Sequence, residues 1–241
     1  MTKPSKQPAK QPAKVPKNWP AHVTYLSTPL YAGISASQRR QLQTQPASGT
    51  PLAEVPPTLA FGPSAQVEIR RIAADAAHPA RGQHGLFAAR RLAPGAFVVP
   101  YWGAYHRGGA GRHVGSDYDL WLDRAADVAV DAARAGNEAR FVNDFRGVPG
   151  AGGRANAEFR EVWDPRRGER AMAVFAARGR SGGIAKGEEV LVSYGKGFWE
   201  VREQEARKKA PPEEGPREAE DDSPVAGAAD ALAALKIAGE S

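Results

Sequence analysis

The chain has 241 residues, of which 41% are hydrophobic and 25% charged, so it can form one domain with a substantial core but not two large ones. No cysteine occurs, which excludes a disulfide framework and a zinc site made of thiolates. The formal net charge of +6 fits an acidic partner, such as nucleic acid or a nucleosome surface, as well as it fits a basic solvated surface. No long apolar run or signal-peptide core occurs, which disfavours a membrane-spanning or secreted protein.

The first 63 residues are predicted to precede the main domain. Residues 1–17 contain lysines and prolines but no acid, which predicts a disordered basic arm. Such an arm could contact phosphates, serve as a nuclear-import signal or only keep the chain soluble. Residues 35–43 predict a short helix capped by Ser35 or Ser37, and the proline-containing stretch 44–57 predicts a linker. Several side chains of this region could dock on the core: Trp19, Tyr25, Leu26, Leu30, Tyr31 and Ile34.

Residues 64–206 are the predicted main domain, in which alternating or apolar runs predict short strands. The predicted strands are 67–72, 86–90, 97–101, 117–122, 128–132, 156–163 and 171–178. The Pro94-Gly95 step favours a type II turn that would join the second and third strands in a hairpin, and a turn at 164–168 would join the last two. Many short strands and little helix predict a β-rich fold, mainly β with short helices.

Beyond Trp199 the sequence becomes polar. Residues 201–210 predict a short polar helix, and an acidic stretch with prolines follows. Residues 225–238 are rich in alanine and leucine and could form a marginal helix. Residues 207–241 are therefore predicted to lie outside the main domain, as an acidic linker followed by a marginal C-terminal helix.

Two segments carry the most specific pattern in the chain. Residues 130–145 read VDAARAGNEARFVNDF, and residues 186–199 read KGEEVLVSYGKGFW. Together they resemble the SET-domain protein lysine methyltransferases, which carry a V-D-A-x-x-x-G-N-x-x-R-F-x-N-H-S segment and a G-E-E-L-x-x-x-Y-G segment in this order. The resemblance implies a SET domain in which the two segments thread past each other in a knot-like crossing, with S-adenosylmethionine as the cofactor. Two paired motifs are more specific than either alone.

The resemblance also implies roles for single residues. The hydroxyl of Tyr194 would lie where amine and methyl meet, and would orient the amine rather than act as a strong base, because a phenol has a pKa near 10. Tyr101, in a Y-x-G match, would line the channel for the substrate lysine. Asn143 would bind the methionine end of the cofactor. The full set of implied cofactor-binding residues is Gly82, His84, Gly85, Leu86, Tyr118, Arg140, Phe141, Asn143, Asp144, Phe198 and Trp199.

Two features depart from the family pattern. Asp144 stands where the family has histidine, and the glycine loop from Gly82 to Gly85 is one residue longer between its glycines than the usual form. Both features leave open a second hypothesis, a catalytically inactive SET-fold module that binds chromatin or protein. A third hypothesis is a basic nucleic-acid-binding β-domain, in which Arg90, Arg91 and the lysine arm contact phosphates.

Methyl transfer to a lysine amine is an in-line displacement that needs two aligned reactants and no metal ion. The five histidines show no ligand-like spacing with acids, so no metal site is expected. The acid pair Glu188-Glu189 lies in a predicted turn and is interpreted as solvated. The resemblance therefore predicts a nuclear protein-lysine N-methyltransferase that acts on a histone tail or another basic protein, with nucleosome or DNA contact through the basic arm and no membrane association.

Overall fold

The computed structural model describes residues 14–45, 51–59, 62–74, 76–109 and 116–200. Most of the basic arm, the glycine-rich stretch 110–115, and the predicted polar helix, acidic linker and C-terminal helix lie outside the described residues. Within the described part of the chain, no helix is long and apolar enough to cross a membrane.

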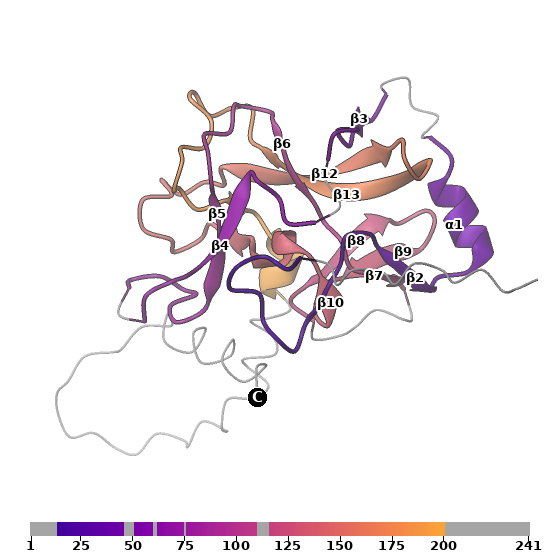
Figure 1. The fold of residues 1–241 in the computed structure, drawn as a ribbon, viewed down its shortest axis with the longest axis horizontal. Helices are drawn as coiled ribbons and strands as arrows, with labels where there is room; N and C mark the ends of the chain where they lie inside the picture. The colour runs from indigo at the N-terminus through magenta and orange to yellow at the C-terminus, as the bar shows by residue number, and fades with distance from the viewer. Residues whose placement is uncertain (1–13, 46–50, 60–61, 75, 110–115, 201–241) are drawn as a thin grey trace, which may run out of the picture.

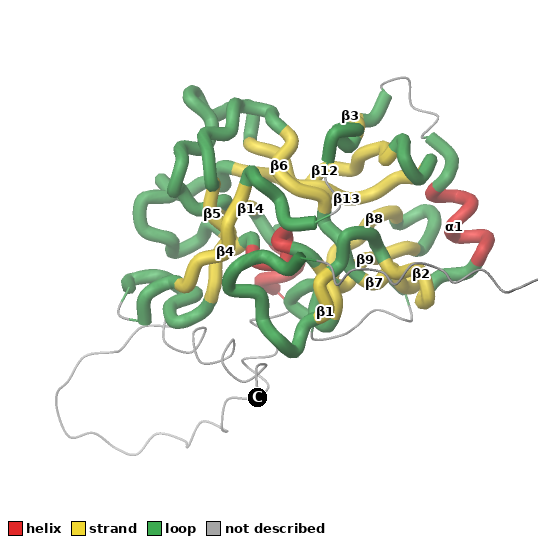
Figure 2. The backbone as a smooth tube through the Cα atoms, viewed as in Figure 1, coloured by secondary structure: helices red, strands yellow, loops and turns green. Residues whose placement is uncertain are grey.

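Short strands outnumber helices among the regular elements of the described residues, which confirms the predicted mainly β fold (Figures 1 and 2). The elements are β1 (Thr24–Tyr25), β2 (Leu30–Gly33), α1 (Ala36–Leu42), β3 (Ala53–Glu54), β4 (Val67–Arg71), β5 (His84–Ala88), β6 (Phe97–Pro100), β7 (Ala104–Arg107), β8 (Asp119–Asp123), β9 (Val128–Asp131), β10 (Ala135–Gly136), the 3-10 helix η1 (Glu138–Phe141), β11 (Asn143–Asp144), β12 (Ala157–Asp164), β13 (Glu169–Ala176) and β14 (Leu191–Val192).

The strands described here form two four-stranded sheets and three strand pairs. The sheets have the orders β3-β12-β13-β6 and β2-β7-β9-β8, and the pairs are β1-β10, β11-β14 and β4-β5. In Figure 1 the two larger sheets lie on the side of α1, and β4 and β5 lie on the opposite side. One buried cluster, which includes Leu86, Val130, Val174 and Val192, connects strands of these groups.

The predicted helix at 35–43 is confirmed as α1. Ser35 is its N-cap: the Gln38 backbone N–H donates to the Ser35 hydroxyl, and the Gln38 side chain accepts from the Ser35 backbone N–H. This reciprocal pair satisfies two donors that a helix start otherwise leaves open. Leu42, fully buried, anchors the helix to the core.

Two predictions of local structure are wrong. The predicted linker 44–57 contains β3, which pairs parallel with β12 and is followed by the fully buried Val55. A strand of two residues shows no period in the sequence, so only its partner reveals it. The predicted hairpin of strands 86–90 and 97–101 does not form, because β5 pairs with β4 and β6 pairs with β13. The other predicted hairpin is confirmed as β12 and β13.

Several described residues before position 63 pack on the β-rich core. Leu26 is buried, and Trp19, Tyr31 and Ile34 pack against the core. The Trp19 ring contacts Phe141 edge-on, with ring centroids 5.7 Å apart. Leu30, by contrast, is 42% exposed, so its predicted docking is wrong.

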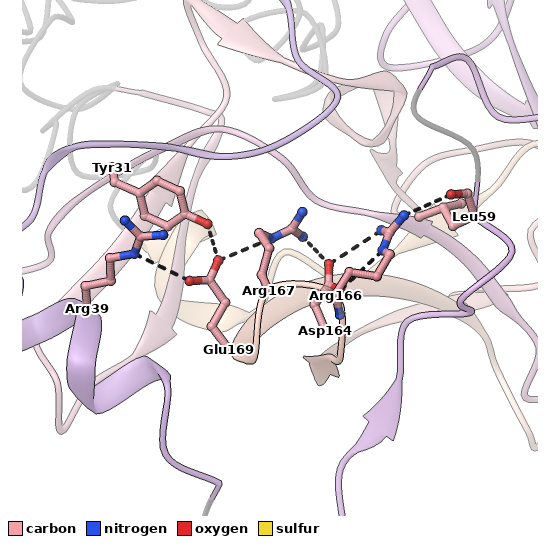
Figure 3. A network of polar contacts seen from close by, with 7 residues as sticks. All are labelled: Tyr31, Arg39, Leu59, Asp164, Arg166, Arg167 and Glu169. Atoms are coloured by element: carbon pink, nitrogen blue, oxygen red, sulfur yellow. Dashed lines mark hydrogen bonds and ion pairs between the residues drawn. The ribbon is translucent and has the colours of Figure 1, made fainter.

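A buried polar network at the turn between β12 and β13 also holds this region in place (Figure 3). Glu169, fully buried, accepts a hydrogen bond from the Tyr31 hydroxyl and pairs with Arg39 and Arg167. Asp164, equally buried, pairs with Arg167 and with Arg166, which donates to the Leu59 carbonyl oxygen at 2.9 Å. The network therefore joins Tyr31, Arg39 and Leu59 to the β12–β13 turn.

Candidate functional site

The two motif segments lie side by side. β11 pairs parallel with β14, with Asn143 opposite Leu191 and Asp144 opposite Val192. Two further hydrogen bonds continue this contact: the Tyr194 hydroxyl donates to the Val142 carbonyl oxygen at 2.7 Å, and the Tyr194 backbone N–H donates to Asp144 Oδ2 at 2.7 Å. Asn143 and Tyr194 therefore belong to one local assembly, whereas the knot-like crossing of their segments stays a prediction.

Tyr194 stands in a cluster of phenols and aromatic rings. Burial raises its pKa well above the ordinary value of 10, and the neighbouring Tyr101 and Tyr118 raise it further. The phenol is therefore neutral at physiological pH and serves as a hydrogen-bond donor and acceptor, not as a base. Its ring contacts Phe198 edge-on, with centroids 4.9 Å apart.

Tyr101 is a buried phenol of the same cluster. It lies directly after β6, and its hydroxyl donates to the Tyr118 carbonyl oxygen at 2.7 Å. Burial and then the charge of Asp131 raise the pKa of Tyr101, so this phenol is also neutral. The sequence interpretation placed Tyr101 and Tyr194 at the substrate lysine, and the structure brings both into one electrostatic environment.

Arg140 and Phe141 join this cluster from η1. The Arg140 guanidinium lies 4.2 Å from the centre of the Tyr118 ring and 4.9 Å from that of Phe141. Arg140 is buried, and its Nε donates to the Ala132 carbonyl oxygen at 3.0 Å. The guanidinium is thus a buried cation in contact with two aromatic rings, and such a contact gains strength from desolvation.

Asn143 is held by a carboxylate that the sequence interpretation misplaced. Glu189 was expected to be solvated, but its side chain is 9% exposed. Glu189 Oε1 accepts a hydrogen bond from Asn143 Nδ2 at 2.8 Å, and Glu189 Oε2 lies 3.0 Å from His78 Nε2. His78 is a further residue of this assembly that no motif indicated. For Glu189, the sequence contains one indication, its place as the second acid of the matching G-E-E segment.

Asp144 fastens the tyrosine segment to its surroundings. Besides the Tyr194 N–H, its carboxylate accepts from the Arg146 backbone N–H at 2.9 Å and pairs with the Arg146 guanidinium at 2.8 Å. The Trp199 indole N–H points to the same carboxylate, with Nε1 3.4 Å from Oδ2. The residue that departs from the family pattern is therefore a buried acceptor for several donors.

The remaining expected cofactor residues lie around this assembly. Phe198 and Trp199 follow Tyr194, with their ring centroids 5.3 Å apart. His84 and Gly85 lie on β5, where the His84 ring contacts Phe141 edge-on and the His84 carbonyl oxygen lies 3.4 Å from Asn143 Nδ2. Gly82 has a φ of +79°, which the turn before β5 requires of a glycine.

Leu86 is fully buried in the core, where its carbonyl oxygen accepts from the Val190 N–H at 2.7 Å. Its backbone therefore joins β5 to the second motif segment. Among the described residues, no group of three His, Asp or Glu side chains could hold a metal ion.

Comparison with protein-family models identifies the domain that contains this assembly. The family model of the SET domain matches residues 83–195. The chain contains a SET domain. The matched range begins within the glycine loop and ends at Gly195, so it includes β11, β14, Tyr101 and Tyr194 but not Phe198 and Trp199.

Solved structures similar to this chain come from polycomb repressive complex 2. One, described as ctPRC2 in an autoinhibited conformation bound to S-adenosylmethionine, is 22% identical over 61% of this chain, with a TM-score of 0.42. Another, the Chaetomium thermophilum complex bound to GSK126, is 22% identical over 58% of this chain, with a TM-score of 0.41. Each match spans 17% of the neighbour's chain. The comparison with curated proteins found no significant match.

Proposed function

We propose that the SET domain of this chain is an S-adenosylmethionine-dependent protein-lysine N-methyltransferase. The observation that carries the proposal is the pairing of β11 with β14, which brings the buried Asn143 and Asp144 together with the half-buried Tyr194 in one assembly. The two segments that match the family motifs are thus neighbours in the folded chain. The cofactor, when bound, supplies a methyl group on a positively charged sulfur.

The residues of the assembly fit the chemistry of such a cofactor. Asn143 presents an amide that suits the ammonium group of the methionine end, and Glu189 accepts a hydrogen bond from the nitrogen of that amide. Phe198 and Trp199 offer aromatic faces for the adenine. His84, Gly85, Tyr118, Arg140 and Phe141 enclose the same region in this proposal.

The two phenols would handle the substrate amine. Because Tyr194 donates its own proton to the Val142 carbonyl oxygen, its lone pairs are left to accept an N–H of the lysine amine. Tyr101 would line the channel for the lysine stem. Since burial keeps both phenols protonated, the lysine must lose its proton to another acceptor, such as water, before it attacks.

The proposed substrate is a lysine of a histone tail or another basic nuclear protein, and the proposed location is the nucleus. The support for both is the motif resemblance and the lysine-rich arm at residues 1–17. In this proposal the arm contacts nucleosomal DNA. Such a contact weakens steeply as salt rises, so nucleosome binding by the full chain, compared with a variant that lacks residues 1–17, measures the contribution of the arm.

A methyl-transfer assay on core histones and nucleosomes tests the proposed activity. The full chain is incubated with radiolabelled S-adenosylmethionine, and Tyr194→Phe serves as the matched variant. We expect incorporation by the wild-type chain and a loss of about 100-fold or more in kcat for Tyr194→Phe, in the range seen when one group that stabilises a transition state is removed. Equal rates for the two proteins would contradict the assigned role of Tyr194.

A second candidate function is a SET-fold binding module without catalysis. Asp144 favours it, because its carboxylate is already engaged by Arg146 and by the Tyr194 backbone N–H. Calorimetry with S-adenosylmethionine separates the two candidates. Measurable cofactor binding supports the enzyme, and its absence favours the module.

A further inference from the structure

A buried chain of hydrogen bonds leads from the loop before β5 to the amide of Asn143. It begins at His78, passes through Glu189 and ends at Asn143, with separations of 3.0 and 2.8 Å. The side chains of His78 and Glu189 are 8% and 9% exposed. Because the three residues come from separate segments of the chain, tertiary packing alone brings them together.

Chemistry fixes the direction of each hydrogen bond in this chain. The Ala80 N–H donates to His78 Nδ1 at 2.9 Å, so Nδ1 carries no proton. The ring proton is therefore on Nε2, which donates to Glu189 Oε2. The Asn143 nitrogen faces two acceptors, the Glu189 carboxylate and the His84 carbonyl oxygen. Its Oδ1 must then point to the opposite side of the amide, where it presents an acceptor.

The backbone of β5 leaves room for this arrangement. A β-carbon at Gly85 would overlap Glu189 Oε1 and would lie 3.1 Å from Asn143 Nδ2. Glycine at this position therefore lets the carboxylate and the amide meet directly above the strand.

We propose that His78 and Glu189 are positioning residues that hold the Asn143 amide with its oxygen toward the ammonium group of an amino-acid ligand. This inference rests on the proposed function, because S-adenosylmethionine carries such a group at its methionine end. Without the hydrogen bond from His78, the Glu189 carboxylate can rotate away from Asn143. The amide can then flip and present its N–H groups to the ammonium, where two donors repel.

Paired variants of His78 test the proposal. His78→Leu removes the donor at similar volume, whereas the amide of His78→Gln can replace the Nε2–H. His106→Leu is the matched control, because it removes another buried pair of histidine and carboxylate, with His106 Nε2 2.9 Å from Asp119 Oδ1. We expect both leucine variants to lower the melting temperature.

The first measurement is the NMR signal of the Asn143 side-chain amide in the free protein, assigned with Asn143→Ala. We expect His78→Leu to shift this signal and to speed its hydrogen exchange, while His78→Gln and His106→Leu leave it in place. An unchanged signal in His78→Leu, or an equal change in His106→Leu, would overturn the proposal. This measurement needs no cofactor.

The second measurement is calorimetry with S-adenosylmethionine. We expect His78→Leu to raise the Kd about 10-fold, the loss of one hydrogen bond to a charged group, with kcat at saturating cofactor unchanged and with rescue by His78→Gln. A wild-type chain that does not bind the cofactor would refute the proposed function, and the amide signal would still decide whether His78 positions Asn143. An unchanged Kd in His78→Leu beside a binding wild type would overturn the positioning role.

Discussion

Asp144 shows how one side chain can take a position that a family gives to another residue. Its carboxylate accepts hydrogen bonds from the Tyr194 N–H and the Arg146 N–H and pairs with the Arg146 guanidinium. A neutral imidazole has a single acceptor nitrogen. Asp144→His, which restores the family residue, therefore leaves buried donors unpaired, and we expect a loss of about 1–3 kcal/mol in the free energy of unfolding.

Urea denaturation measures this loss, and Asp144→Asn is the control. The asparagine keeps one acceptor oxygen and the same shape, so we expect a smaller loss for it than for histidine. A stability gain in Asp144→His would show that the carboxylate is tolerated at this position rather than used.

At the residue scale, the motifs indicated two segments that the structure brings together, whereas the roles of Asn143 and Tyr194 stay predictions. Glu189 was misjudged and His78 was missed. The burial of Glu189 depends on the absent β-carbon of Gly85 and on the path of the loop that carries His78. Neither is encoded in local spacing, because both are properties of segments that meet only in the folded chain.

At the scale of elements, a substitution at the turn between β12 and β13 tests whether the buried ion pairs there stabilise the packing of Tyr31 and Arg39 on the sheet. We expect Glu169→Gln to lower the free energy of unfolding by about 3 kcal/mol, because it removes one charge of a buried ion pair with Arg167. Glu161→Gln is the control: this acid is 28% exposed and pairs with Arg170 at 2.9 Å, so we expect a loss below about 1 kcal/mol. Equal losses in urea denaturation would contradict the role of Glu169.

The prediction of strands and helices succeeded where the segment itself carries the signal, either a periodic pattern of apolar residues or a capping residue. The runs that became β4, β9, β12 and β13 were all predicted, and so was α1 through its capping residues. The prediction failed where pairing with a distant strand determines the structure. β3 is a strand only because β12 lies beside it, and the predicted hairpin of residues 86–101 is opened because β4 and β13 take its two strands.

For the whole molecule, the buried Glu138 makes stability depend on pH. Burial raises the pKa of its carboxyl above the ordinary 4.5, so the folded state binds the proton more tightly than the unfolded state. The stability that this proton contributes is fully present below pH 4.5 and is lost as the pH rises through the folded pKa. We expect Glu138→Gln to raise the melting temperature at pH 7. We also expect the melting temperature of this variant to rise less than that of the wild type when the pH is lowered.

Melting curves between pH 4.5 and 8 check this prediction. The glutamine oxygen can still accept from the Ser64 N–H, which donates to Glu138 Oε1 at 2.7 Å. A pH profile of Glu138→Gln parallel to that of the wild type would assign the effect to another group.

The parallel pairing of β3 with β12 has a consequence for synthesis on the ribosome. Ala53 leaves the exit tunnel long before Val162, its neighbour in the sheet, has been translated. β1 and β2 wait in the same way for β10 and β7. A nascent chain released before β12 would expose unpaired strand edges to aggregation and chaperones, so the early part of this polypeptide acquires its shape only after the later part has emerged.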